Sequence, residues 1–255
     1  MKTILKMLQE VKELPDLVYC EFLKLKRKKF IILTVFAAAL FPIPMTVFAA
    51  TGNVRQGWLY STIFEFGYFL LLPVVLGILG AVLFFSERSN ETWKNLGVIP
   101  VSAAALIVAK IVTLLLFSVI YSFAINGVAL IGSVIIGSSD HIPDRFLFGL
   151  LVGIMVAVSV LPVLAVECLS TKGYVFSIII SLVYTVVSFI SVLSISNLIL
   201  PLSAVFRWAL PYMATGTVDG FENWFFSFPA CIGILALTAV ASVLLAVIFK
   251  SRQEG

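Results

Sequence analysis

Few side chains in this sequence could carry out a reaction. The one histidine, His141, stands alone in a short polar stretch, and the three cysteines, Cys20, Cys168 and Cys231, show no paired spacing. There is no HExxH, no GxSxG and no pair of aspartates in an apolar segment, so the groups with which intramembrane hydrolases activate water or a nucleophile are missing. A GxxxxGK[ST] loop is missing too, which excludes ATP binding by a P-loop. We therefore expect no catalytic residue, no metal site and no cofactor bound to this chain.

The composition explains this shortage of reactive groups. Of the 255 residues, 61% are hydrophobic and 12% are charged, and the mean hydropathy is +1.14. Soluble domains are about 45–50% apolar and about a quarter charged. These values exclude a soluble globular protein, a disordered chain and an ordinary nucleic-acid-binding protein. They predict an all-α polytopic membrane protein with little mass outside the bilayer.

Six apolar runs are long enough to cross a membrane, since a spanning helix needs about 20 apolar residues. They cover about 30–50, 63–85, 106–136, 146–166, 174–193 and 225–249. The third run is longer than one crossing requires, so we expect either that it tilts or that its first turns belong to the preceding cytosolic element. We expect residues 1–255 to form one transmembrane domain.

The basic residues orient these spans, because cytoplasmic loops carry an excess of Lys and Arg. With both ends in the cytosol, 14 basic residues lie inside and only Arg55, Arg145 and Arg207 lie outside. A cleavable signal peptide is the alternative interpretation of the first run, but its lead of 29 residues is too long. We therefore expect six spans with both termini cytosolic.

The first 29 residues predict an interfacial segment. Apolar residues recur at helical spacing over residues 1–14, and Pro15 is expected to end that helix, after which Asp16 can cap a second one. Apolar burial and attraction to anionic headgroups would hold the segment along the cytosolic leaflet. A solvated basic lead that only sets the topology is the alternative. The residues expected to make the membrane contact are Phe22, Lys24, Lys26 and Arg27.

Two further stretches suggest surface elements. In the polar stretch 86–102, Trp93, Leu96 and Pro100 fall at i, i+3 and i+7, as on a short helix with Trp93 at the headgroup level. Its polar face can bind a cytosolic partner, although a plain polar loop is the alternative. On the outer side, residues 194–224 stay apolar but are broken by prolines, which predicts a re-entrant or surface-lying element or an ordered loop. The residues that mark this element are Pro201, Arg207, Trp208 and Pro211.

Within the spans, the sequence offers kinks, a close helix contact and one acid. Prolines interrupt the first, second and fourth spans, at Pro42 and Pro44, Pro73, and Pro162. The small-xxx-small pair Gly149 and Gly153 predicts a close helix contact. Glu65 lies at the outer end of the second span and is a weak candidate for contact with a transported substrate.

Two local patterns resemble those of the permease subunits of ABC-2-type exporters. The lead from Glu21 to Lys29 is similar to the pattern E-h-x-K-h-x-R-x-x before the first span. The stretch from Ser86 to Leu96, followed by Ile99-Pro100-Val101-Ser102 and by Ala109-Lys110, resembles the family loop E-x-x-x-x-x-W-K-x-L-x-x-x-P-V-x. Its Trp-Lys version is most similar to the bacteriocin and lantibiotic immunity branch, which includes bacitracin-type resistance permeases.

The resemblance implies a multi-pass protein of the bacterial plasma membrane that carries no ATPase of its own. Two copies of a cytosolic ABC ATPase, which bind ATP and Mg, would dock on a coupling helix after the second span. A second permease, the same chain or a sister chain, would complete the dimer, and the re-entrant element would lie at about 197–211. The substrate would be an amphipathic peptide antibiotic, expelled to give immunity or resistance. The docking residues that the resemblance implies are Glu87, Arg88, Glu91, Trp93, Lys94 and Asn95.

Two other function classes remain open at this point. One is an ATP-independent, ion-coupled carrier, for which Glu65 would be the residue to test. The other is a membrane scaffold of a sensing complex. Membrane lipids are partners under every interpretation, and no nucleic acid is expected.

Overall fold

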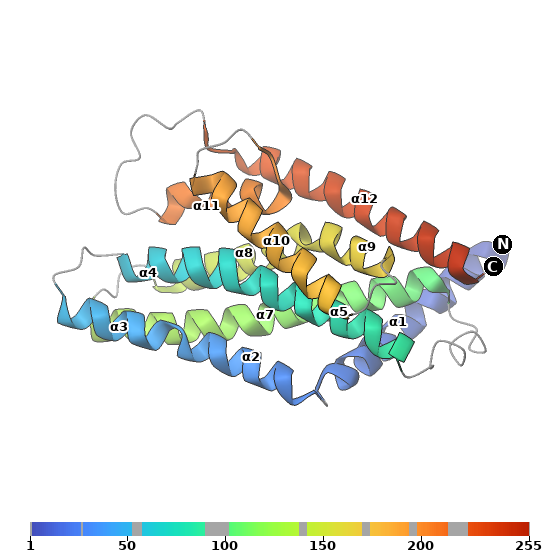
Figure 1. The fold of residues 1–255 in the computed structure, drawn as a ribbon, viewed down its shortest axis with the longest axis horizontal. Coiled ribbons are helices and arrows are strands. Elements are labelled where there is room, and N and C mark those ends of the chain that lie inside the picture. Colours follow the sequence, from blue (N-terminus) through green and yellow to red (C-terminus); the bar gives the residue numbers. More distant parts are fainter. Residues whose placement is uncertain are drawn as a thin grey trace.

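The fold is a bundle of long helices whose axes run mostly along the longest dimension of the molecule (Figure 1). Both termini lie at the end of the bundle where α5 ends and α7 begins, as the even number of spans predicts. The computed structural model describes residues 2–26, 28–52, 58–89, 102–137, 142–169, 174–193, 198–213 and 224–254. The helices are α1 (Lys2–Lys26), α2 (Lys29–Leu40), α3 (Pro42–Thr51), α4 (Trp58–Ile63), the π-helix η1 (Phe64–Leu71), α5 (Leu72–Ser89), α7 (Ala103–Ile135), α8 (Ile142–Ser159), α9 (Leu161–Leu169), α10 (Tyr174–Leu193), α11 (Pro201–Met213) and α12 (Phe228–Glu254).

Six helical segments in the described part of the chain are long and apolar enough to cross a membrane. They are Ile31–Thr51, Trp58–Phe85, Ala104–Ile135, Pro143–Cys168, Val175–Val192 and Phe228–Phe249. The prediction of an all-α polytopic protein with six spans is confirmed. The largest boundary difference is in the second span, which begins at Trp58 rather than at 63. The long third run is one helix of 33 residues, about 50 Å at 1.5 Å per residue.

Helix α1 differs from the prediction, because Pro15 lies inside one continuous helix of 25 residues. The expected break at Pro15 and the separate helix capped by Asp16 were wrong. A proline removes one main-chain hydrogen bond and can bend a helix without ending it. The continuous helix carries Glu21 and Leu25, one turn apart, into the bundle, where both are buried.

Prolines interrupt three spans, as predicted. The first span breaks at Phe41, between α2 and α3. In the second span, the N–H of Leu72 donates to the carbonyl of Gly67, an i→i−5 bond that closes η1 just before Pro73. In the fourth span, the N–H of Val163 donates to the carbonyl of Val160 at 2.9 Å, so the helix does not use the carbonyl of Ser159.

The small-residue face of α8 contacts α7 of the same chain. A Cβ atom on Gly153 would lie 1.9 Å from Oγ of Ser122, and one on Gly149 would lie 2.1 Å from Nδ2 of Asn126. The hydroxyl of Ser118 donates to the carbonyl of Gly153 at 2.6 Å. The close helix contact predicted from the glycines is therefore present, and it joins the third and fourth spans in the core.

Burial is uneven across the six spans. The second, third and fourth spans form the centre of the bundle, whereas the first, fifth and sixth lie at its periphery. Large apolar side chains are exposed on α2, α10 and α12, for example Phe36, Val183 and Leu237. These outer faces are available to lipid or to a second membrane protein.

Candidate functional site

Most of the predicted docking residues lie outside the described part of the chain. These are Glu91, Trp93, Lys94 and Asn95. Glu87 and Arg88 fall in the last turn of α5, where the structure describes the backbone only. The structure therefore describes the two helices that flank the predicted coupling helix, α5 before it and α7 after it.

Helix α7 begins with a side-chain cap. The hydroxyl oxygen of Ser102, the N-cap residue, accepts a hydrogen bond from the N–H of Ala105 at 3.1 Å. A capping serine satisfies one of the free N–H groups at a helix start, typically a contribution of about 1 kcal/mol. This cap fixes the point at which the chain enters the third span, two turns before Lys110.

Lys110 is fully buried and joins three helices. Its Nζ atom lies 3.1 Å from Oε2 of Glu21 on α1 and donates to the carbonyl of Leu83 on α5 at 3.0 Å. The other carboxylate oxygen of Glu21 accepts from Lys24. Glu21 is itself only 2% exposed. We call Glu21, Leu83 and Lys110 the coupling node, because they bind α1, α5 and α7 together.

The coupling node connects the two sequence patterns that carry the family resemblance. Glu21 opens the first pattern, and Lys110 closes the second. The sequence alone placed Lys110 among the basic residues that set the topology and did not predict a partner for it. A lysine inside an apolar helix is a signal for a buried pair, because an unpaired charge there would cost several kcal/mol.

The predicted interfacial residues have different environments. Phe22 is half-buried, and Lys26 is exposed in the last turn of α1. Lys24 is partly exposed, at 41% of its side chain, and pairs with Glu21. Arg27 lies outside the described residues. Helix α1 therefore packs one side into the bundle and keeps basic side chains on the other.

The segment between the fifth and sixth spans contains helix α11, and most of this helix is buried. Its start is well suited to a helix, because Pro201 occupies the first helical position and Ser203 Oγ accepts from the N–H of Leu200 at 2.9 Å. Pro211 lies in the last turn. Residues 201–209 are all buried, and residues 201–213 are helical rather than an ordered loop.

Arg207 and Trp208 anchor α11 within an aromatic cluster. Arg207 is only 6% exposed, and its Nε donates to the carbonyl of Trp224 at 2.6 Å. Its guanidinium carbon lies 4.0 Å from the ring centre of Phe226. Burial lowers the pKa of Arg207, although a guanidinium remains charged at neutral pH. The ring of Trp208 lies 5.4 Å from that of Phe148 on α8.

Tyr184 links α11 to the kink in the fourth span, and sequence reasoning missed it. Its hydroxyl donates to the carbonyl of Ser159 at 2.7 Å, the group that the kink leaves free. The same oxygen accepts from the N–H of Leu202, in the first turn of α11, at 3.3 Å. One side chain of α10 thus satisfies two main-chain groups of other helices. No sequence signal distinguishes this tyrosine.

Two acidic residues lie within the spans and have no partner among the described residues. Glu65 is half-buried in η1. Glu167 on α9 is fully buried, and neither of its carboxylate oxygens has a hydrogen-bond partner. Glu65 is a candidate from the sequence, whereas Glu167, which directly follows the predicted fourth span, was not predicted, although an acid beside an apolar run is itself a functional signal.

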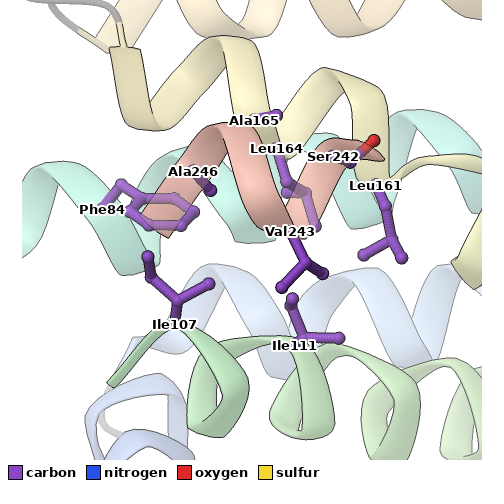
Figure 2. A pocket seen from close by; sticks show the side chains of 9 residues that line it. All are labelled: Phe84, Ile107, Ile111, Leu161, Leu164, Ala165, Ser242, Val243 and Ala246. Carbon is purple, nitrogen blue, oxygen red and sulfur yellow. The ribbon is translucent and has the colours of Figure 1, made fainter. Parts of the chain in front are cut away.

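An apolar groove lies beside the coupling node, among α5, α7, α9 and α12 (Figure 2). Figure 2 shows side chains from these helices pointing toward a common space, with the ring of Phe84 at one side. Nζ of Lys110 lies 5.5 Å from the centre of that ring. The lining residues are Phe84, Ile107, Ile111, Leu161, Leu164, Ala165, Ser242, Val243 and Ala246.

Among the residues that the structure describes, no group of His, Cys, Asp and Glu is arranged to hold a metal ion.

Comparison with known proteins gives one match. A family model described as "ABC-2 family transporter protein" matches residues 17–188, more than half of the chain. The matched range includes Glu21, Lys110, Glu167 and Tyr184 and ends before α11. Neither the curated proteins nor the solved structures contain a match.

Proposed function

We propose that this chain, which belongs to the ABC-2 family of transporter proteins, expels an amphipathic peptide antibiotic of the lantibiotic or bacteriocin type from the bacterial plasma membrane. Family membership makes the chain a multi-pass permease subunit of an ABC transporter, without an ATPase of its own, that associates with a cytosolic ABC ATPase. The proposed substrate rests on the Trp93-Lys94 version of the loop, which resembles the immunity branch.

The proposed docking surface is the stretch after α5, with Glu87, Arg88 and Trp93 to Asn95 at its centre. The excess of basic residues supports a cytosolic position for this stretch and for both termini. The end of α5, the beginning of α7 and both termini lie at the same end of the bundle, as that topology requires (Figure 1). Two copies of the ATPase would bind ATP and Mg and dock on two permeases.

The observation that carries the proposal is the coupling node. Glu21, Leu83 and Lys110 tie α1, α5 and α7 together directly beyond the docking stretch. Because a buried ion pair is costly to separate, movement of the docking stretch would displace the three helices as a unit. Closure of the ATPase pair would then rock one permease against the other, with the second permease either the same chain or a sister chain.

The test is a detergent pull-down of the tagged full-length chain from its native membrane, followed by mass spectrometry. The proposal predicts an ABC ATPase in stoichiometric amount, and any second permease in the eluate distinguishes a heterodimer from a homodimer. Cells that lack the chain should become sensitive to a peptide antibiotic, and the unaltered chain should restore their resistance.

Two results would contradict the proposal in different ways. Recovery of the ATPase without any change in sensitivity across a panel of lantibiotics and bacteriocins would refute the substrate and leave the permease intact. Absence of an ATPase, together with transport that collapses with the proton gradient, would instead indicate an ion-coupled carrier.

A further inference from the structure

Glu167 is the buried charge for which the structure provides no protein partner. It is 0% exposed, and both carboxylate oxygens lack a hydrogen-bond partner. An ionised carboxylate can only accept hydrogen bonds, and leaving one unpaired in an apolar environment is costly. The buried lysine of α7, Lys110, is held by Glu21 and Leu83. Glu167 therefore needs either a proton or a cation from outside the described chain.

The carboxylate packs directly against a glycine. A Cβ atom placed on Gly80 of α5 would lie 2.6 Å from Oε2 of Glu167 and 2.1 Å from Cδ2 of Leu164. Any larger residue at position 80 would therefore displace both side chains. The seam between α5 and α9 is narrow here, and only glycine permits the present approach.

Two further buried oxygen atoms without partners lie on α10. The hydroxyls of Ser177 and Ser181, one turn apart on α10, are buried and make no hydrogen bond. Ser181 packs against Gly77, where an added Cβ would lie 1.8 Å from its Oγ. Oxygen atoms of Glu167 on α9 and of Ser181 on α10 thus pack against glycines three positions apart on α5. An ammonium or guanidinium group, which offers only donors, would satisfy such a set.

The apolar groove adjoins this polar seam. Leu164 contacts the seam and also lines the groove, and Phe84, one turn after Gly80, forms the groove wall on α5 (Figure 2). The groove itself is small, about 10 Å³, so a molecule could place an apolar body in it and a cationic group beside Glu167 only by displacing side chains, Leu164 among them.

The geometry points to Glu167 as the anchor for the cationic group of an amphipathic substrate, ammonium or guanidinium, whose apolar part occupies the groove. This inference rests on the proposed transport function and deepens it by naming the chemistry of the substrate. The site lies next to the coupling node, because Phe84 separates the groove from Lys110. Occupation of the groove and movement of α1, α5 and α7 are thus mechanically connected.

The test measures binding to the full chain in lipid nanodiscs without the ATPase. The probe is dansylcadaverine, a fluorescent primary amine, and its N-acetylated form is the matched neutral probe. We expect the unaltered chain to bind the amine at least about tenfold more tightly, the equivalent of about 1.4 kcal/mol. Glu167→Gln should reduce this preference to near unity, because the amide keeps the shape and removes the charge. Asp16→Asn, which alters an exposed acid on α1, should retain it.

A second measurement uses only the unaltered chain and is independent of how Glu167→Gln folds. A hydrophobic carbodiimide labels carboxyl groups in apolar surroundings, and peptide mass spectrometry locates the label. The amine should protect Glu167 from labelling, and the acetylated probe should not.

The inference is overturned if the unaltered chain binds both probes equally, if Glu167→Gln retains the preference, or if the amine does not protect Glu167. In each case Glu167 would be a protonated core residue. None of these results affects recovery of the ATPase with the chain, so failure of this inference is distinct from failure of the proposed function.

Discussion

The Nζ atom of Lys110 lies 3.1 Å from Oε2 of Glu21, although 89 positions separate the two residues in sequence. Both side chains are buried, with exposed fractions of 0% and 3%. The pair joins the helix that precedes the first span to the helix that follows the docking stretch. It therefore ties helix α1 to the third span, which follows the proposed docking stretch.

Removal of one partner of this pair should be strongly destabilising. We expect Glu21→Gln and Lys110→Met each to lower the free energy of unfolding by about 3–5 kcal/mol, because the first removes the carboxylate beside buried Lys110 and the second leaves Glu21 with only the partly exposed Lys24. The double variant should recover part of this loss. Denaturant unfolding in detergent micelles measures all three. Lys24→Met is the control, because Lys24 is partly exposed and its pair should contribute less than about 1 kcal/mol. Equal losses from Lys24→Met and Lys110→Met would refute the importance of the buried pair.

The docking stretch can be tested by the double substitution Trp93→Ala and Lys94→Ala. We expect the variant to insert normally but to lose the ATPase in pull-downs, because the substitutions remove an aromatic and a cationic contact of the proposed surface. Lys172→Ala, in the loop between the fourth and fifth spans, is the matched control and should retain the ATPase. Normal ATPase recovery and transport by the double variant would show that the coupling helix is elsewhere.

Tyr184→Phe tests the link between α11 and the kink in the fourth span. The change removes one hydroxyl and leaves the Ser159 carbonyl and the Leu202 N–H without their shared partner. We expect a loss of about 1–3 kcal/mol in stability, since two main-chain groups lose their hydrogen bond. Tyr212→Phe is the control, because Tyr212 is exposed on α11. The two variants would melt at the same temperature if the Tyr184 hydroxyl had no structural role.

Gly153→Ala tests the close approach of α7 and α8. The added methyl group would meet Ser122 Oγ at 1.9 Å, so the helices must separate, at a cost of about 1–3 kcal/mol. Gly127→Ala on α7 is the matched control, because no atom lies within 4 Å of its added Cβ. It should stabilise the helix by up to about 1 kcal/mol, the difference in helix propensity. We expect the thermal unfolding temperature to fall for Gly153→Ala and to rise for Gly127→Ala.

Arg207→Lys tests the anchor of α11. Lysine keeps the charge but loses the Nε–carbonyl bond to Trp224 and the planar contact with Phe226. A hydrogen bond from a charged group contributes about 1.5–3 kcal/mol, and we expect a loss in that range by thermal unfolding. Arg145→Lys is the control, because Arg145 is half-buried and lies over a single ring, that of Tyr60. Arg207 would not be an anchor if both variants unfolded at the unaltered temperature.

The sequence alone was enough to predict the membrane class, the six spans and the family. The membrane class and the spans depend on local composition, because about 20 consecutive apolar residues suffice to cross a bilayer and hydropathy does not depend on tertiary contacts. The family was inferred from the resemblance of two local patterns to those of known permeases. The fifth span, predicted at 174–193, coincides with α10. The predicted end of the first helix at Pro15 was wrong. A proline removes one main-chain hydrogen bond, but it does not decide whether the turns on either side of it continue as one helix.

Only the tertiary structure decided which polar groups meet. Glu21 and Lys110 are 89 positions apart, and no periodicity in either segment predicts that they share one buried site. The contact of Gly149 and Gly153 with α7, rather than with another chain, likewise depends on how the helices are arranged. Glu167 is visible in the sequence as an acid in an apolar run, but its lack of a partner is a property of the packed interior. Pairing and burial arise from contacts between distant segments, and sequence patterns report only on neighbours along the chain.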